Sequence, residues 1–591
     1  SRQYLRIVIH LHFTRGVHMT DLSVLRDAIR DDHLADEAAI LDRLIKSHGP
    51  DQATRTAAKA RATRLVTSIR NDADAGLMEV FLAEYGLSTR EGIALMCLAE
   101  ALLRVPDATT IDALIEDKIA PSAWGEHLGK SSSSLVNAST WALMLTGRVL
   151  QDGEGMDRVL RGALRRLGEP VIRTAVARAM REMGRQFVLG QTMPDAMARA
   201  AKQEAKGYSY SYDMLGEAAM TMADADAFFA SYKTAIAKIT PRCNAGDIRS
   251  NPGISIKLSA LHPRYEVAQK DRVMSELVPR VLELALNARQ GGMGLNIDAE
   301  EANRLDLSLD VIEAVLADPR LAGWDGFGVV VQGYGLRAGA VIDWLYALAT
   351  KLDRKIMLRL VKGAYWDTEV KLAQVEGLSG FPVYTRKSAT DVAYLCLAKK
   401  LLGLTDRIYP QFATHNAHSV AAIIEMATDP TLFEFQRLHG MGEALHDLVL
   451  KGNATRCRIY APVGAHRDLL AYLVRRLLEN GANSSFVNQI MDENTPPEVV
   501  AACPFERLEG AGPNLAVRHP SALFAPERAN SRGFDLSDPV TLAELDAARA
   551  PFRTHRWQAG PILAKPATGA DDITQTCPAD PTDIVGRVTE A

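Results

Sequence analysis

Several features that would assign this chain of 591 residues to a common protein class are absent from it. No uninterrupted apolar run approaches the ~18 residues of a membrane-spanning helix. The six cysteines are scattered without CxxC or metal-like spacing, which is typical of reduced core thiols in a cytoplasmic protein. The net charge of −4 gives no general attraction to nucleic acid, so we expect no nucleic-acid partner.

Short motifs for metals, catalytic nucleophiles and dinucleotides are missing as well. No His, Asp and Glu grouping has the spacing of a metal site, and we therefore predict no metal. No nucleophile elbow or Ser-His-Asp order stands out. No GxGxxG follows the first expected strand, although a doubly wound dinucleotide-binding sheet requires one. A bound organic cofactor is the simplest remaining source of reactivity.

The chain has ample core, with 47% hydrophobic and 24% charged residues, and is long enough for several domains. After an irregular leader, residues 20–85 show helical periodicity with almost no glycine, which predicts helices without a compact core of their own. We assign residues 1–86 to the leader and a helical arm. Strongly apolar helical stretches, one ending before Pro106, then predict a helical domain over residues 87–206.

Beyond the helical domain, short apolar strands alternate with amphipathic helices. Eight strands are expected at Tyr208–Leu215, Ile254–Leu258, Leu295–Asp298, Gly328–Gln332, Ile356–Lys362, Tyr409–His415, Phe433–Leu438 and Arg458–Pro462. Eight βα units in ~250 residues have the size of a (β/α)8 barrel, whereas an open doubly wound sheet has fewer strands as a rule. We predict an α/β fold with a TIM-like (β/α)8 barrel over residues 207–490.

The expected strands end in polar residues, and in such barrels the chemistry lies at these ends. The residues are Asp213, Lys257, Asp298, Gln332, Arg359, Lys362, His415, Asn416, Gln436 and Tyr460. Singly, each has a simple structural interpretation: Asp213 or Asp298 as a helix cap, Lys257 as a surface lysine, His415 as a core histidine. Together they indicate a site, because buried strands rarely end in charges without one.

A helix expected within residues 458–480 has two different faces. Leucines at helical spacing form the packing side, and Arg475, Arg476 and Glu479 lie on the other. Adjacent guanidinium groups suit a small acid whose carboxylate must be held still. By itself, the stretch is better explained as an ordinary exposed Arg475–Glu479 helix pair worth about 0.2–0.5 kcal/mol. Together with the cations at the strand ends, the arginine pair predicts a net positive charge at the carboxyl-terminal opening of the barrel. Such a charge favours an anionic substrate or cofactor.

The last part of the chain is rich in proline and aspartate and has weak periodicity. We assign residues 491–560 to a linker with one short helix at Leu542–Arg549. Residues 561–591 are expected to be the start of a further domain.

Long motifs give a resemblance. They read YSYSYDMLGEAA, ISIKLSALHPRYE, LNIDAEEANRLDLSLD, RLVKGAYWDTEVKLAQ, PVYTRKSATDVAYL, YPQFATHNAHS, FEFQRLHGMGE and RIYAPVGAHRDLLAYLVRRLLENGANSSFVN. The chain resembles the proline utilisation A family, bacterial bifunctional enzymes with a flavin-dependent proline dehydrogenase barrel. The resemblance implies FAD, oxidation of L-proline to Δ1-pyrroline-5-carboxylate, and transfer of electrons to a membrane quinone. A cytoplasmic protein, peripheral to the inner membrane when it meets the quinone, is expected, and a homo-oligomer is left open.

The family pattern also implies roles for individual residues. Arg475 and Arg476 with Lys257 would grip the proline carboxylate, and Glu479 would orient the arginines. The proline ring would be enclosed by Asp298, Tyr365, Leu438 and Tyr460. The flavin would be lined by Arg359, Lys362, Gln332, Ala364, Trp366, Thr385, His415, Asn416 and Gln436. A cation beside the ring stabilises its reduced state, and a clamped carboxylate fixes proline C5 near flavin N5.

Two departures from the family limit what we expect. The N-terminal region lacks a ribbon-helix-helix pattern, so the DNA-binding repressor activity of some relatives is expected to be absent. Residues 561–591 resemble only the opening of the family's aldehyde dehydrogenase half, so the NAD-dependent oxidation of glutamate semialdehyde is expected to lie outside this chain. Two alternatives stay open: a flavin barrel acting on another small acid or a folate, and a scaffold or DNA-binding regulator built on an inactive barrel.

Overall fold

The computed structural model describes residues 21–71, 188–464, 489–490, 495–512, 514–565 and 571–590. The chain divides into two compact units, Ser1–Arg532 and Gly533–Ala591. Among the described helices, none combines the length and the apolar character needed to span a bilayer.

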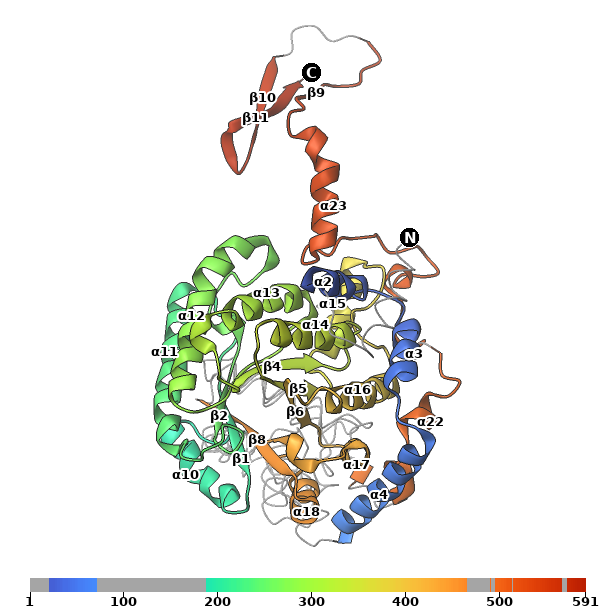
Figure 1. Ribbon diagram of the computed structural model, residues 1–591. Coiled ribbons are helices and arrows are strands. Elements are labelled where there is room, and N and C mark those ends of the chain that lie inside the picture. Colours follow the sequence, from blue (N-terminus) through green and yellow to red (C-terminus); the bar gives the residue numbers. More distant parts are fainter. Residues whose placement is uncertain are drawn as a thin grey trace, which may run out of the picture. The chain divides into compact units, whose positions relative to one another are not determined.

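The first unit is built around eight parallel strands that form a closed barrel in chain order (Figure 1). The strands are β1 (Ser209–Met214), β2 (Gly253–Ile256), β3 (Leu295–Ile297), β4 (Phe327–Gln332), β5 (Ile356–Val361), β6 (Ile408–Ala413), β7 (Glu434–Leu438) and β8 (Arg456–Val463). Pairing of β1 with β8, with Ser209 opposite Arg458, closes the ring. The predicted (β/α)8 barrel is confirmed, and each of the eight expected segments overlaps one strand, with ends that differ by at most two residues.

A helix follows each strand from β1 to β7, as expected. These helices are α11 (Met222–Ile239), α12 (Lys270–Gln290), α13 (Leu305–Leu316), α14 (Ala338–Lys351), α16 (Lys387–Leu402), α17 (Ala417–Met426) and α18 (Glu443–Asn453). An additional helix, α15 (Trp366–Glu376), precedes α16 and was missed. It buries only three residues, so it lacks the apolar stripe from which a helix is recognised in a sequence. The arginine-bearing helix expected within residues 458–480 falls largely outside the described residues.

The alternation of side chains along β1 shows how the sequence builds both sides of the barrel wall. Tyr210 and Tyr212 stack with ring centroids 5.6 Å apart and are buried. Ser211 contacts Ser255 of β2 and Arg359 of β5 with its hydroxyl, so this side of the strand faces the barrel interior. Aromatic residues therefore pack outside the wall, and polar residues are directed inward.

Three N-terminal helices lie along the outside of the barrel (Figure 1). They are α2 (Leu22–Asp31), α3 (Glu37–His48) and α4 (Gln52–Asn71), which pack against α14, α16 and α17 in that order. Asp21 and Asp36 begin the first two, each accepting a hydrogen bond from a backbone amide of the first turn. The apolar side chains of all three helices join the core of the barrel unit, so this helical region has no separate core.

The predicted helical domain lies outside the described residues except for its end. There, α10 (Met193–Glu204) runs into β1, and its buried side chains belong to the barrel core. Part of the expected linker also folds onto the first unit: α21 (Pro497–Val500) packs on α4, and α22 (Pro504–Leu508) packs on α16.

The described residues of the second unit form one α-helix, one short 3-10 helix (Ala550–Phe552) and a small sheet. α23 (Pro539–Arg549) contains the short helix expected at Leu542–Arg549 and begins at Asp538, whose carboxylate accepts from two backbone amides. The sheet has the order β10 (Asp572–Cys577), β11 (Asp580–Thr589), β9 (Trp557–Ala559), with β10 antiparallel and β9 parallel to β11.

Candidate active site

Five charged and polar side chains, one from each of β1, β2, β3, β5 and β8, meet toward the carboxyl ends of these strands. We call them the mouth cluster: Asp213, Lys257, Asp298, Arg359 and Tyr460. Lys257 directly follows β2, and its Nζ lies 2.7 Å from Asp213 Oδ1 and 3.6 Å from Asp298 Oδ2. Arg359 Nη1 donates to Asp298 Oδ1 at 2.8 Å, and the Tyr460 hydroxyl donates to Asp298 Oδ2 at 2.8 Å. Asp298 therefore ties both cations and the phenol together.

Burial and the neighbouring carboxylates together set the protonation of Lys257 and Tyr460 in the mouth cluster. Burial by itself lowers the pKa of Lys257, but Asp213 and Asp298 outweigh it and raise the pKa well above the ordinary value. Lys257 therefore stays charged. Burial raises the pKa of Tyr460, which keeps the phenol protonated as a donor to Asp298.

The charges of the mouth cluster balance, with two cations against two carboxylates. The predicted excess of positive charge therefore depends on Lys362 and on Arg475 and Arg476. Both arginines and Glu479 lie outside the described residues, so their roles stay predictions.

The structure decides against three simple interpretations of these residues. Asp213 caps no helix: α11 is capped by Thr221, and Asp213 instead binds Lys257. Lys257 is not a surface lysine, because its side chain is only 8% exposed. The backbone turn after Asp298 begins at Glu301, so Asp298 is not a helix cap either.

The guanidinium of Arg359 is held on several sides. Nε donates to Gln436 Oε1 at 2.6 Å. Nη2 donates to the hydroxyls of Ser211 at 3.2 Å and Ser255 at 3.0 Å. Its Cζ lies 5.1 Å from the centroid of the Tyr460 ring, within cation–π range. Arg359 is thus a buried cation with a fixed position.

Gln332, Lys362 and Ala364 lie on the neighbouring ends of β4 and β5. Gln332 Nε2 donates to Glu300 O at 2.8 Å, and Gln332 Oε1 accepts from Ala364 N at 3.4 Å. Lys362 binds Asp391 of α16, and its Nζ lies 5.6 Å from the centroid of the Tyr394 ring. The amide and the ammonium are therefore both anchored at the same end of the barrel.

His415 and Leu438 connect the ends of β6 and β7. The amide of Leu438 donates to His415 Nε2 at 3.0 Å, which places the imidazole proton of a neutral ring on Nδ1. His415 is half-buried and accepts a backbone hydrogen bond at the strand ends. Asn416 caps α17, its Oδ1 accepting from Ser419 N at 2.9 Å.

The remaining expected residues lie around α15 and the loop after it. Tyr365 directly precedes α15, and Trp366 Nε1 donates to Tyr384 O at 2.9 Å. Thr385 is bound by the arm: its backbone amide and its hydroxyl each donate to the Glu37 carboxylate at 2.6 Å. Asn514 Nδ2 also donates to Thr385 O, at 3.2 Å.

Sequence reasoning did not select four residues that hold this site together. Ser211 and Ser255 lie two positions before Asp213 and Lys257, so the two-residue period of a strand could have placed them on the same inner face. Asp391 and Glu37 sit on helices outside the wall and carry no such signal. Asp213 itself was noted at a strand end without being assigned a role.

Comparison with known proteins identifies the family. The family model described as "Proline dehydrogenase" matches residues 196–489, which include every barrel strand and the mouth cluster. The chain belongs to the proline dehydrogenase family. A model described as "Proline utilization A proline dehydrogenase N-terminal domain" matches residues 23–70, which correspond to the three N-terminal helices of this proline dehydrogenase family member.

Bifunctional members of the family are similar over most of the chain. The Bifunctional protein PutA of Klebsiella aerogenes is 51% identical over 552 residues, 90% of this chain and 42% of that protein. That of Escherichia coli K12 is 49% identical over 591 residues, 96% of this chain and 45% of that protein. A crystal structure of Bradyrhizobium japonicum Proline Utilization A superposes with a TM-score of 0.70 at 50% identity, covering 88% of this chain and 53% of that one. The chain thus spans about half the length of these relatives.

A further family model, described as "DNA-binding domain of Proline dehydrogenase", matches residues 77–187. These residues coincide with most of the expected helical domain and lie outside the described part of the chain. Our expectation that the protein has no nucleic-acid partner stays a prediction beside this match.

Proposed function

We propose that this chain oxidises L-proline to Δ1-pyrroline-5-carboxylate, with FAD bound in the barrel and a membrane quinone as the final electron acceptor. The observation that carries the proposal is the mouth cluster, a buried set of fixed charges at the catalytic end of a proline dehydrogenase barrel. The NAD-dependent second step, from glutamate semialdehyde to glutamate, is assigned to the family's C-terminal half. We also propose a cytoplasmic location, with peripheral membrane contact where the protein meets the quinone.

The proposed substrate contacts begin with Lys257. An ammonium has three N–H donors, and its bond to Asp213 uses one of them, so Lys257 can also donate to a carboxylate. Arg475 and Arg476 complete the grip, with Glu479 orienting them. The ring of proline is enclosed by Asp298, Tyr365, Leu438 and Tyr460. Such a grip supports catalysis by orientation, because it fixes one carbon of the substrate relative to its acceptor.

The residues proposed to hold FAD fit that group by their chemistry. They supply two cations, Arg359 and Lys362, and two side-chain amides, Gln332 and Gln436, from β4, β5 and β7 at one end of the barrel. Cations suit the pyrophosphate and the negative charge of the reduced ring, and amides suit its alternating donors and acceptors. When bound, FAD supplies the hydride acceptor. Ala364, Trp366, Thr385, His415 and Asn416 are proposed to complete this surface.

The chain's own contribution is a rigid electrostatic environment. Arg359 is 3% exposed and held by four side chains, so its charge needs no reorganisation during the reaction. Asp213, Lys257 and Arg359 of the mouth cluster are buried, which strengthens the charge interactions among them. Arg359 is thus suited to stabilising the negative charge that proline oxidation adds to the flavin.

The deciding experiment is the visible spectrum of the purified protein before and after anaerobic addition of L-proline. We expect a flavin band that bleaches with proline. Binding of tetrahydrofuroic acid, a carboxylate analogue of proline, should perturb the same band without bleaching it.

Each other result points to a different function. A flavin band unaffected by either ligand would favour a barrel that acts on another small acid or a folate. Colourless protein that retards DNA on a gel at physiological salt would favour a regulator built on an inactive barrel.

A further inference from the structure

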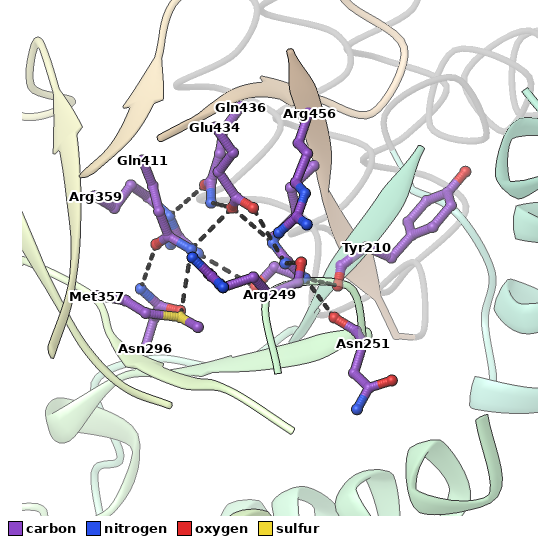
Figure 2. Close-up of polar contacts among 12 residues, drawn as sticks. Tyr210, Arg249, Asn251, Asn296, Met357, Arg359, Gln411, Glu434, Gln436 and Arg456 are labelled. Atoms are coloured by element: carbon purple, nitrogen blue, oxygen red, sulfur yellow. Dashed lines mark hydrogen bonds and ion pairs between the residues drawn. The ribbon is translucent and has the colours of Figure 1, made fainter. Parts of the chain in front are cut away.

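A connected set of polar side chains crosses the closed interior of the barrel below the mouth cluster. Figure 2 shows it running from Asn296 through Gln411 to Glu434, and from Glu434 through Gln436 to Arg359. The side chains come from β3, β5, β6 and β7, and all five residues are at most 3% exposed. Buried polar groups at this density must all be satisfied, so each one constrains its neighbours.

Glu434 is the centre of this network. Its Oε1 accepts from Gln411 Nε2 at 2.9 Å, Gln436 Nε2 at 2.9 Å and Arg458 Nε at 2.7 Å. Its Oε2 accepts from Arg458 Nη2 at 3.2 Å. Every partner is a donor, so the carboxylate acts only as an acceptor.

Arg458 fixes the carboxylate from the amino-terminal side of the barrel. Besides Glu434, it donates to the carbonyl oxygens of Tyr210 at 3.2 Å, Asn251 at 2.8 Å and Arg249 at 2.7 Å. A guanidinium has five N–H donors, and these bonds use all of them. The Glu434–Arg458 pair is therefore held in one position, and the other side chains of the network are anchored to it.

The chemistry of the partners determines how the Gln436 amide is turned. Arg359 can only donate, and the Glu434 carboxylate only accepts. Gln436 lies between them and must therefore direct its oxygen toward Arg359 and its nitrogen toward Glu434. The opposite orientation of the amide would place donor against donor and acceptor against acceptor. The carboxylate of Glu434 thus decides which atom meets the guanidinium of Arg359.

We propose that Glu434 is a positioning residue for the reaction: by fixing the amide of Gln436, it holds the guanidinium of Arg359 at the site of the flavin. This inference rests on the proposed function. Glu434 contacts neither substrate nor cofactor and acts only through Gln436. Without the carboxylate, the amide is free to turn its NH2 group toward Arg359, which has no acceptor to offer, and the guanidinium is displaced.

The test is the midpoint potential of the bound flavin in a variant that lacks the Glu434–Arg458 pair. Glu434→Leu with Arg458→Leu takes both charges away together, so neither is left buried and unpaired. A displaced Arg359 stabilises the reduced flavin less. We expect the equilibrium between oxidised and reduced flavin to shift at least tenfold toward the oxidised form, which is a fall of about 30 mV for two electrons.

Two further variants make the measurement specific. Glu434→Asp keeps a charge for Arg458 but withdraws the carboxylate from Gln436, so it should lower the flavin potential as well. This single variant also provides the test if the double variant does not fold. Gln411→Met is the matched control: it removes another bond to the same carboxylate but leaves both bonds of Gln436, to Glu434 and to Arg359, in place. The control should lose stability but keep the parent potential.

The outcomes separate this inference from the function on which it rests. A lowered potential in the Glu434 variants but not in Gln411→Met supports the inference. If proline bleaches the parent protein while all variants keep its potential, Glu434 is only structural and the inference is wrong. If the parent binds no flavin, the proposed function fails, and the inference fails with it.

Discussion

Asp298 shows how a single residue organises the candidate active site. Its two oxygens receive Arg359 and Tyr460 and lie near Lys257, so side chains from β2, β5 and β8 converge on one carboxylate. Such convergence needs no sequence motif, because the closed barrel brings the ends of its strands together. At the scale of single residues, the chemistry of the site depends on which cation each carboxylate contacts.

For the arginine pair, we expect Arg476→Met to raise the KM for proline about 10- to 100-fold, because a charge-assisted hydrogen bond to a carboxylate is worth about 1.5–3 kcal/mol. Flavin content should be unchanged, since the residue is assigned to substrate and not to cofactor. Steady-state kinetics and the flavin-to-protein absorbance ratio measure the two effects. An unchanged KM would remove the carboxylate role from Arg476.

Asp391 gives a prediction for the dependence of stability on pH. Burial alone would raise the pKa of Asp391, but Lys362 and Lys387 outweigh it and lower the pKa to about 2. A carboxylate with a lowered folded-state pKa stabilises the protein above the unfolded-state value of about 3.8 and loses that effect as pH falls toward 2. The difference corresponds to about 2 kcal/mol at neutral pH.

We therefore expect Asp391→Asn to lower the free energy of unfolding by at least about 2 kcal/mol at pH 7, and by progressively less below pH 4. Urea unfolding followed at pH values from 7 down to 3 measures the difference. Lys387→Met is a useful companion, because it removes one of the two cations and should produce a smaller effect. A difference that stays constant with pH would contradict the assignment.

At the scale of elements, the three N-terminal helices are attached to the barrel by both buried and exposed ion pairs. Arg26 of α2 reaches Asp306 Oδ1 and Asp310 Oδ1 on α13, and its guanidinium lies 5.3 Å from the Trp344 ring of α14. Lys59 of α4 forms an exposed pair with Glu506 at 2.8 Å. The two contacts have similar geometry but very different surroundings.

Burial should decide what each of these contacts contributes. Arg26→Met leaves the carboxylate of Asp306 buried with fewer partners, and we expect it to cost about 3 kcal/mol. Lys59→Met removes an exposed pair and should cost less than about 1 kcal/mol. Denaturant unfolding of both variants tests the comparison. Equal losses would show that the buried pair is not what fastens α2 to the barrel.

For the whole molecule, the division into two units predicts that the barrel is stable without the second. Every barrel strand, every N-terminal helix and the mouth cluster belong to Ser1–Arg532. A chain ending at Arg532 should therefore keep its flavin band and its bleaching by proline. We expect its thermal midpoint to lie within about 2 °C of the parent, which for a unit of this length corresponds to about 2 kcal/mol. A larger fall would mean that Gly533–Ala591 stabilises the barrel unit.

The sequence by itself determined the barrel, the positions of its strands to within two residues at each end, and the family. The periodicities of strands and helices are local properties of the sequence. A run of apolar residues that ends in a charged residue can likewise be recognised from the sequence alone. It therefore placed Lys257, Asp298 and Tyr460 at one end of one fold. It missed α15, because a helix that buries few residues has no apolar stripe to recognise.

Only the tertiary structure decided which of these groups meet. The bonds from Thr385 to Glu37 join residues 348 positions apart, and the bond from Arg359 to Gln436 spans 77. Such pairings depend on how helices pack and how the ring of strands closes, and no local pattern encodes them. The same closure seals Glu434 inside the barrel, where a carboxylate must find donors, and so connects the floor of the barrel to its mouth.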